Sequence, residues 1–172
     1  GVRLAVNVAA MLLVFIAFIA MANFALFHWV GSWTGLNEII AERSGGQHDG
    51  LRMQYLLGGL FAPMAWVIGV PSGDLVSIGQ LLGEKTILNE FVAYASLSDL
   101  KASGNIQHER SIIIATYALC GFANFSSIGI QIGGISAIAP SQRKTLSELG
   151  FWALIGGTAA CLMTACIAGM IV

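Results

Sequence analysis

The chain has 172 residues, of which 56% are hydrophobic and 10% are charged, and its mean hydropathy is +0.79. Soluble domains carry about a quarter charged residues, so this composition predicts a membrane protein. A formal net charge of −1 provides no strongly basic surface, which argues against nucleic acid as a partner.

The first predicted element is a membrane-spanning helix over residues 4–27, a stretch with no charged residue. About 20 apolar residues suffice for a helix to cross a hydrocarbon core of about 30 Å, so this segment is long enough. It lacks a preceding loop and an initiator Met, from which we expect the chain to be an excerpt of a longer protein, with its N-terminal half absent.

Residues 29–50 form a polar connection in which Trp29 and Trp33 are placed like anchors at a membrane surface. The apolar stretch that follows, residues 51–70, is short and contains Pro63. We therefore expect a helix that lies along the membrane interface or packs against protein and does not cross the bilayer.

Residues 72–99 have the pattern of a re-entrant helical hairpin. Ser72 or Asp74 is expected to cap a first short helix that stops at Gly83, and Thr86 to cap the second helix. Helices of about ten to twelve residues reach about halfway through a bilayer, at about 1.5 Å per residue. Backbone at that depth must be buried in protein or line a cavity. The polar tip, "GEKTILNEFVAY", therefore predicts a site for a hydrophilic ligand near the membrane midplane.

Residues 110–139 are long enough to span the membrane but are interrupted within "CGFANFSSIGIQIGG". Glycine and side chains that hydrogen-bond their own backbone favour local unwinding. A discontinuous helix that faces a hairpin is the construction of substrate sites in secondary transporters. Residues 149–172 then predict a final spanning helix, rich in small residues for close packing in lipid. The predicted fold is thus an all-α membrane protein, one inverted repeat of such a transporter.

The short loop "PSQRKTLSE" carries Arg143 and Lys144, and this basic density favours the cytoplasmic side. The hairpin would then enter the membrane from the outside, and the C-terminus would lie outside.

Glu90 is the most informative polar residue, because a carboxylate in the bilayer core costs about 2.5–3.5 kcal/mol and marks a functional site by default. In the first turn of the second hairpin helix it would gain from the helix dipole. The alternatives are a structural ion pair with Lys85 or a tip that reaches water. Asn124 and Ser127 would share one helix face, and their alternative role is to satisfy backbone groups freed by the break.

Phe122 and Phe125 are either packing residues or a wall on which a flat ring stacks. Glu84 and Lys85 are expected to stabilise the tip without contacting ligand. The histidines and cysteines have no metal-ligand spacing, so no metal site is predicted. Ser126 and Ser127 have no base beside them in sequence, which makes a membrane hydrolase a weak alternative.

These motifs carry a family resemblance. The strings "FAPMAWVIGVP", "GEKTILNEFVAY", "ATYALCGFANFSSIGIQIGG" and "APSQRK" resemble the C-terminal half of the concentrative nucleoside transporters, and the match covers essentially all 172 residues. Members of that family are cation-coupled symporters of nucleosides. The resemblance implies that Glu90, Asn124 and Ser127 contact the ribose and that Phe122 lines the pocket.

The resemblance also implies a multi-pass protein of the plasma (inner) membrane that forms homotrimers, with residues 4–27 near the threefold contact. It implies no enzymatic activity and no organic cofactor. The base-reading site and the site of the coupling Na⁺ or H⁺ would lie mainly in the N-terminal half. Two alternatives remain: a transporter of another polar solute on the same architecture, and a membrane scaffold that transports nothing.

Overall fold

The computed structural model describes residues 2–44 and 48–172, and every regular element in these ranges is helical, which confirms the all-α prediction. The elements, in chain order, are α1 (Val2–Phe24), the π-helix η1 (Ala25–Gly31), α2 (Ser32–Thr34), α3 (Leu36–Arg43), α4 (Met53–Val67), the 3₁₀ turn η2 (Ser72–Asp74), α5 (Leu75–Ile87), α6 (Glu90–Ala102), α7 (Glu109–Leu119), α8 (Phe125–Ile138), the 3₁₀ turn η3 (Pro140–Gln142) and α9 (Arg143–Ile171).

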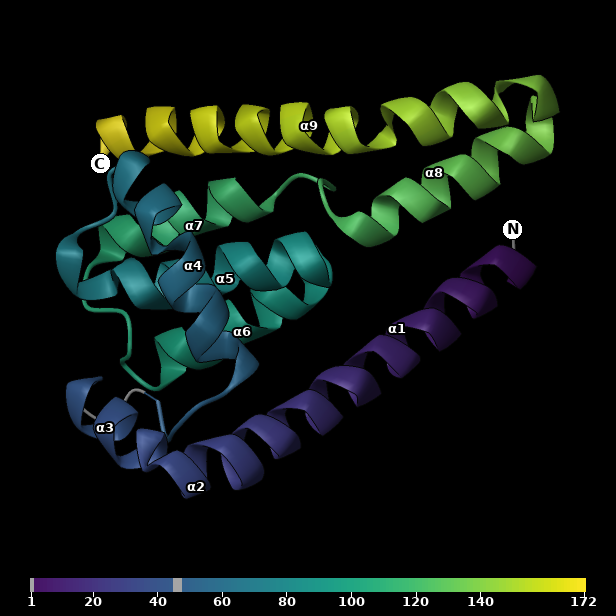
Figure 1. The fold of residues 1–172 in the computed structure, drawn as a ribbon. Helices are drawn as coiled ribbons and strands as arrows, with labels where there is room; N and C mark the ends of the chain where they lie inside the picture. The colour runs from purple at the N-terminus through teal and green to yellow at the C-terminus, as the bar shows by residue number, and fades with distance from the viewer. Residues whose placement is uncertain (1, 45–47) are drawn as a thin grey trace.

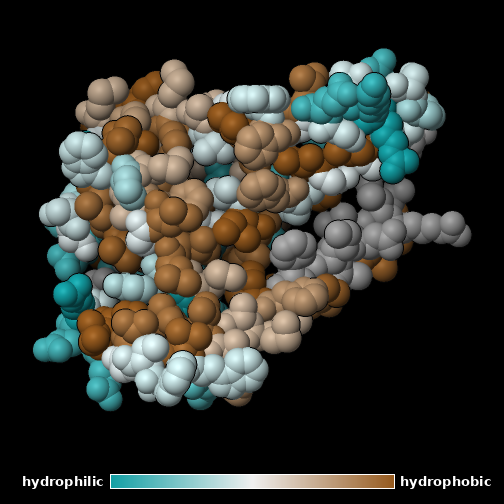
Figure 2. Space-filling model, in the orientation of Figure 1, coloured by the Kyte–Doolittle hydropathy of each residue, from teal (hydrophilic) through white to brown (hydrophobic). Residues whose placement is uncertain are grey.

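Helices α4 to α7 form a compact bundle, while α1 runs away from it as a separate rod and α9 crosses the opposite side (Figure 1). Within the described part of the chain, two helical stretches are long and apolar enough to cross a membrane, Ile16–Thr34 and Pro140–Ile171. Apolar residues also cover much of the visible surface (Figure 2). On α1, for example, Phe18 and Met21 are exposed. This surface suits a lipid or protein environment better than water.

Helix α5 is the centre of the bundle. Every residue from 77 to 85 is buried, because α4, α6 and α7 surround this helix. The approach of α4 is especially close: a Cβ on Gly79 would lie 2.8 Å from the Ala62 nitrogen and would also meet the Gly58 carbonyl. Of the two alternatives for residues 51–70, α4 therefore packs against protein.

The polar connection over residues 29–50 is more helical than expected, although residues 45–47 lie outside the described residues. His28, between the predicted spanning helix and the predicted connection, lies in η1. The Phe27 carbonyl accepts the π-helical hydrogen bond from the Ser32 N–H and also accepts from Asn37 Nδ2 at 2.9 Å. Asn37 Oδ1 accepts in turn from the Leu51 N–H at 2.8 Å, so one side chain links η1 to the residues just before α4.

The helix boundaries of the hairpin differ from the expectation. Helix α5 runs through Gly83 to Ile87, because Gly83 is a close-packing position where a Cβ would lie 2.7 Å from Leu57. Thr86 donates to the Leu82 carbonyl and caps nothing. The cap of α6 is Asn89, whose Oδ1 accepts from the Val92 N–H at 3.0 Å.

The start of the hairpin also differs. Asp74 occupies the N-cap position of α5 but makes no capping hydrogen bond. Its buried carboxylate instead accepts from the backbone N–H groups of Gln107 and His108, from His108 Nδ1 and from Ser111 Oγ, at 2.6–3.1 Å. Asp74 thereby ties the hairpin entrance to the beginning of α7. The last helix also starts earlier than residue 149, at Arg143, since residues 143–149 contain no Gly or Pro.

Candidate functional site

The break in the second half of the chain lies where the hairpin ends. Helix α7 stops at Leu119 and α8 starts at Phe125, and the turn between α5 and α6 meets this gap. Two hydrogen bonds join the two parts: Ser126 Oγ donates to the Leu88 carbonyl at 3.0 Å, and Asn124 Nδ2 donates to Glu90 Oε2 at 2.9 Å. The structure thus brings Glu90 and Asn124 into direct contact.

Asn124 organises the break. As the N-cap of α8, its Oδ1 accepts from the Ser127 N–H at 2.8 Å and from Ser127 Oγ at 2.8 Å. Ser126 Oγ lies 2.7 Å from the same oxygen and shares its one hydrogen between it and the Leu88 carbonyl. The amide thereby satisfies backbone freed by the break, while its Nδ2 holds Glu90. The backbone role considered for Asn124 is therefore present, and its contact with a ligand stays a prediction. Ser127 joins the cluster through Asn124.

The charges of the hairpin complement the ends of the broken helix. Glu90 is 7% exposed and lies in the first turn of α6, beside the N-cap of α8, where two positive helix ends favour a carboxylate. Lys85 is 3% exposed, and its Nζ donates to the Ala118 carbonyl at 2.7 Å, in the last turn of α7. Among the described residues Lys85 pairs with this carbonyl and forms no ion pair with Glu90.

A hollow of about 530 Å³ adjoins this cluster, between α8 and α9. Phe122, Asn124 and Ser127 line it, together with Gln131 and apolar residues of both helices. The Phe122 side chain is 70% exposed and turns its ring outward. Glu90 does not line the hollow itself and adjoins it through Asn124.

Two contributors were missed by sequence reasoning: Asn89 caps the helix that carries Glu90, and Ser126 reaches the turn of the hairpin. Lys85 was considered as a partner of Glu90, but its contact is a backbone carbonyl. An Asn directly before a first-turn Glu is an N-cap pattern and was available as a signal for Asn89. In the described ranges, no three His, Cys, Asp or Glu side chains are placed to hold a metal ion.

Comparisons with known proteins give matches to the sequence and to the fold of the chain. Residues 1–169 match the family model described as "Na+ dependent nucleoside transporter C-terminus". An uncharacterized transporter of Haemophilus influenzae is 41% identical over 175 residues, which cover 100% of this chain and 39% of the relative. Solute carrier family 28 member 3 of Mus musculus is 41% identical over 99% of this chain and 24% of its own length.

A solved structure, of CNTnw in an inward-facing substrate-bound state, superposes with a TM-score of 0.81 at 41% identity. The alignment covers 97% of this chain and 38% of that one. This chain therefore spans between 24% and 39% of the length of these three proteins.

Proposed function

Because the chain belongs to the family of Na⁺-dependent nucleoside transporters, we propose that it forms the C-terminal part of a nucleoside–cation symporter. In this proposal the cluster at the helix break binds the ribose. The coupling Na⁺ or H⁺ and the base are bound mainly by the N-terminal half of the same protein. The assembled transporter is a homotrimer of the plasma membrane and works by alternating access.

One observation carries the proposal: Glu90 is buried without a counter-ion among the described residues, yet it is held in place by Asn124 at the edge of a hollow. A carboxylate has about four lone-pair sites, and Asn124 uses one of them. The remaining sites suit the donor hydroxyls of a sugar, and hydrogen bonds to a charged group are the strong ones. The exposed ring of Phe122 offers a flat apolar face beside them.

The exposed apolar residues of α1 support the proposed assembly. Val6, Phe18 and Met21 are each more than half exposed in the isolated chain. In the trimer we place this helix near the threefold contact, where partner helices cover part of its surface. The two apolar helical stretches support a multi-pass membrane location.

Uptake of radiolabelled uridine by the full-length protein tests the proposal. We expect Na⁺ or H⁺ dependence and weak competition by an analogue lacking a ribose hydroxyl, since a site built to bond hydroxyls rejects analogues without them. Glu90→Gln should lower uptake at least about tenfold, because a hydrogen bond to a charged group contributes about 1.5–3 kcal/mol. Glu148→Gln, at an exposed carboxylate of α9, is the matched control and should transport like the wild type.

The other outcomes are equally informative. Equal uptake by Glu90→Gln and Glu148→Gln would contradict the ribose site. Uptake restricted to other polar solutes would favour a different substrate on the same architecture. Absence of uptake for every solute would favour a scaffold.

A further inference from the structure

Glu84 is a second buried carboxyl in the hairpin, and the ribose site leaves it unused. It lies on α5 and is 2% exposed. Its Oε1 accepts from Gln80 Nε2 at 2.9 Å, and Ser96 of α6 lies beside it. Its Oε2 is buried and has no hydrogen-bond partner in the described part of the chain.

No cation faces this carboxyl among the described residues. Helices α4 and α8 pack against α5 and contain no Asp, Glu, Lys, Arg or His, and Tyr55 of α4 stacks on His48. The remaining titratable groups on α5, η2, α6 and α7 are bound elsewhere or exposed. The bound groups are Asp74, Lys85, Glu90 and Tyr94, and the exposed ones are Asp99, Lys101, Glu109, Arg110 and Tyr117.

The protonation state of Glu84 follows from these surroundings. An ionised carboxylate here would be a buried charge with no cation beside it among the described residues, at a cost of several kcal/mol. A proton on Oε2 removes the charge and turns the unpartnered acceptor into a donor, for which the Ser96 hydroxyl is a candidate acceptor. We propose that Glu84 is a proton-binding site of the α5–α6 hairpin, which holds this residue as the neutral carboxylic acid when packed as in this structure.

Proton binding at Glu84 has a consequence for transport, and this second step rests on the proposed function. Release of the proton to solvent leaves a negative charge buried between α5 and α6 without a cation beside it. This charge destabilises the packed hairpin. The same hairpin carries Glu90 at its tip. Raising the pH through the titration of Glu84 therefore lowers uptake.

Infrared difference spectroscopy of the purified full-length protein tests the proton site without any transport. At neutral pH we expect the carbonyl stretch of a protonated carboxyl, which disappears at high pH and is absent from Glu84→Gln. Glu148→Gln should retain it. A wild type without the band, or a Glu84→Gln variant that keeps it, would overturn the proposal.

A second variant covers the case in which Glu84→Gln does not fold. Gln80→Leu removes the hydrogen bond to Glu84 Oε1 and must shift the band to higher frequency. A band that stays in place belongs to another carboxyl and overturns the assignment.

Uptake as a function of pH tests the second step. The wild type and Glu148→Gln should lose about tenfold in uptake per pH unit above the midpoint, as a single-site titration requires. Glu84→Gln should show a flat profile over the same interval, and parallel profiles would overturn the coupling. If the band behaves as expected and no nucleoside is taken up, the proposed function fails while the proton site stands.

Discussion

Asn124 uses the two ends of its amide for different purposes, and substitutions can separate them. Serine is a good N-cap but has no amide to reach Glu90, whereas alanine has neither group. We expect Asn124→Ser and Asn124→Ala to reduce uridine uptake at least about tenfold, from the loss of a charge-assisted hydrogen bond of about 1.5–3 kcal/mol. Only the alanine variant should also lose about 0.5–2 kcal/mol of stability, measured by thermal unfolding of the full-length protein.

Two results would contradict this division of roles. Normal uptake by Asn124→Ser would show that the contact with Glu90 is dispensable. Equal unfolding temperatures for the serine and alanine variants would show that the cap contributes nothing to α8.

At the same scale, the sequence predicted which side chains gather at the break but not how they pair. Glu90 and Asn124 stand out because polar groups are costly among apolar neighbours, and the hydrogen bond joins positions 34 residues apart. The partner of Lys85 could not be predicted, since a backbone carbonyl such as that of Ala118 has no sequence signature. Whether the cluster binds ribose stays a prediction until uptake is measured.

At the scale of elements, charged side chains of the hairpin lie beside helix ends of opposite partial charge in the broken helix. Glu90 lies beside the positive start of α8, and Lys85 contacts the negative end of α7. Lys85 is the cationic half of this arrangement, in contact with the last turn of α7. Lys85→Met keeps most of the side-chain volume but leaves the buried Ala118 carbonyl unpaired, at a cost of about 1–3 kcal/mol. We expect a lower midpoint of thermal unfolding for the full-length protein.

The matched control is Lys101→Met, at an exposed position of α6. It should change stability by less than about 0.5 kcal/mol, as surface substitutions usually do. Equal effects of the two substitutions would mean that the contact between Lys85 and Ala118 does not hold the two elements together.

Element boundaries show where sequence reasoning stops. The long apolar stretches could be predicted because length and hydrophobicity suffice for a span. Gly83 was wrongly taken as a helix stop, because a glycine indicates either a C-terminal cap or a close helix contact. Only the packing of α5 on Leu57 of α4 decides between these, and that contact depends on the tertiary fold.

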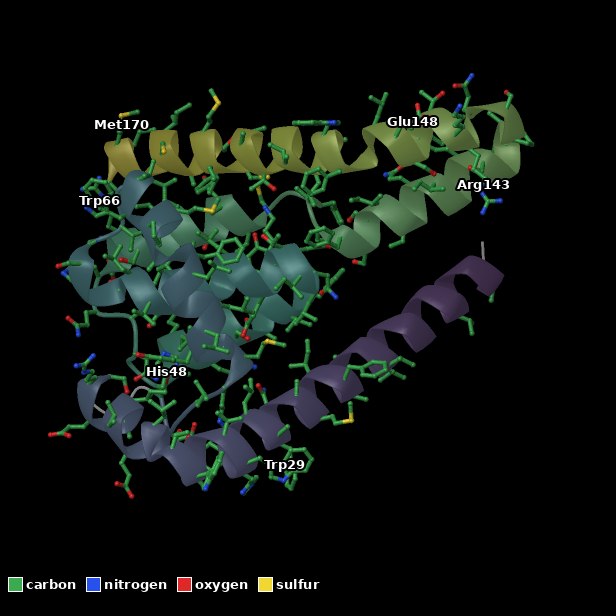
Figure 3. The ribbon with its side chains drawn as sticks, viewed as in Figure 1. Trp29, His48, Trp66, Arg143, Glu148 and Met170 are labelled. Atoms are coloured by element: carbon green, nitrogen blue, oxygen red, sulfur yellow. The ribbon has the colours of Figure 1, made fainter. Side chains whose placement is uncertain are left out.

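For the whole molecule, two opposite ends define a long axis. Arg143 and Glu148 lie at the opposite end from Trp66 and Met170 (Figure 3). The junction of α8 and α9 shares its end with the N-terminus, whereas α3, the start of α7 and the C-terminus lie at the other end (Figure 1). The turn between α5 and α6 points from that second end towards the middle, beside the break. We therefore expect the long axis to run across the bilayer, with the candidate site inside it.

The direction of this axis in the membrane can be measured by labelling single cysteines. Arg143 and Lys144 favour the cytoplasmic side for the junction of α8 and α9, because short basic loops are retained there.

In a full-length background with Cys120, Cys161 and Cys166 replaced by alanine, we expect a membrane-impermeant thiol reagent added to intact cells to label Ser103→Cys. Ser141→Cys should be labelled only after permeabilisation. Both positions are exposed, so that access to the reagent depends on the side of the membrane. The reverse pattern would place the hairpin entrance on the cytoplasmic side and would contradict the expected orientation.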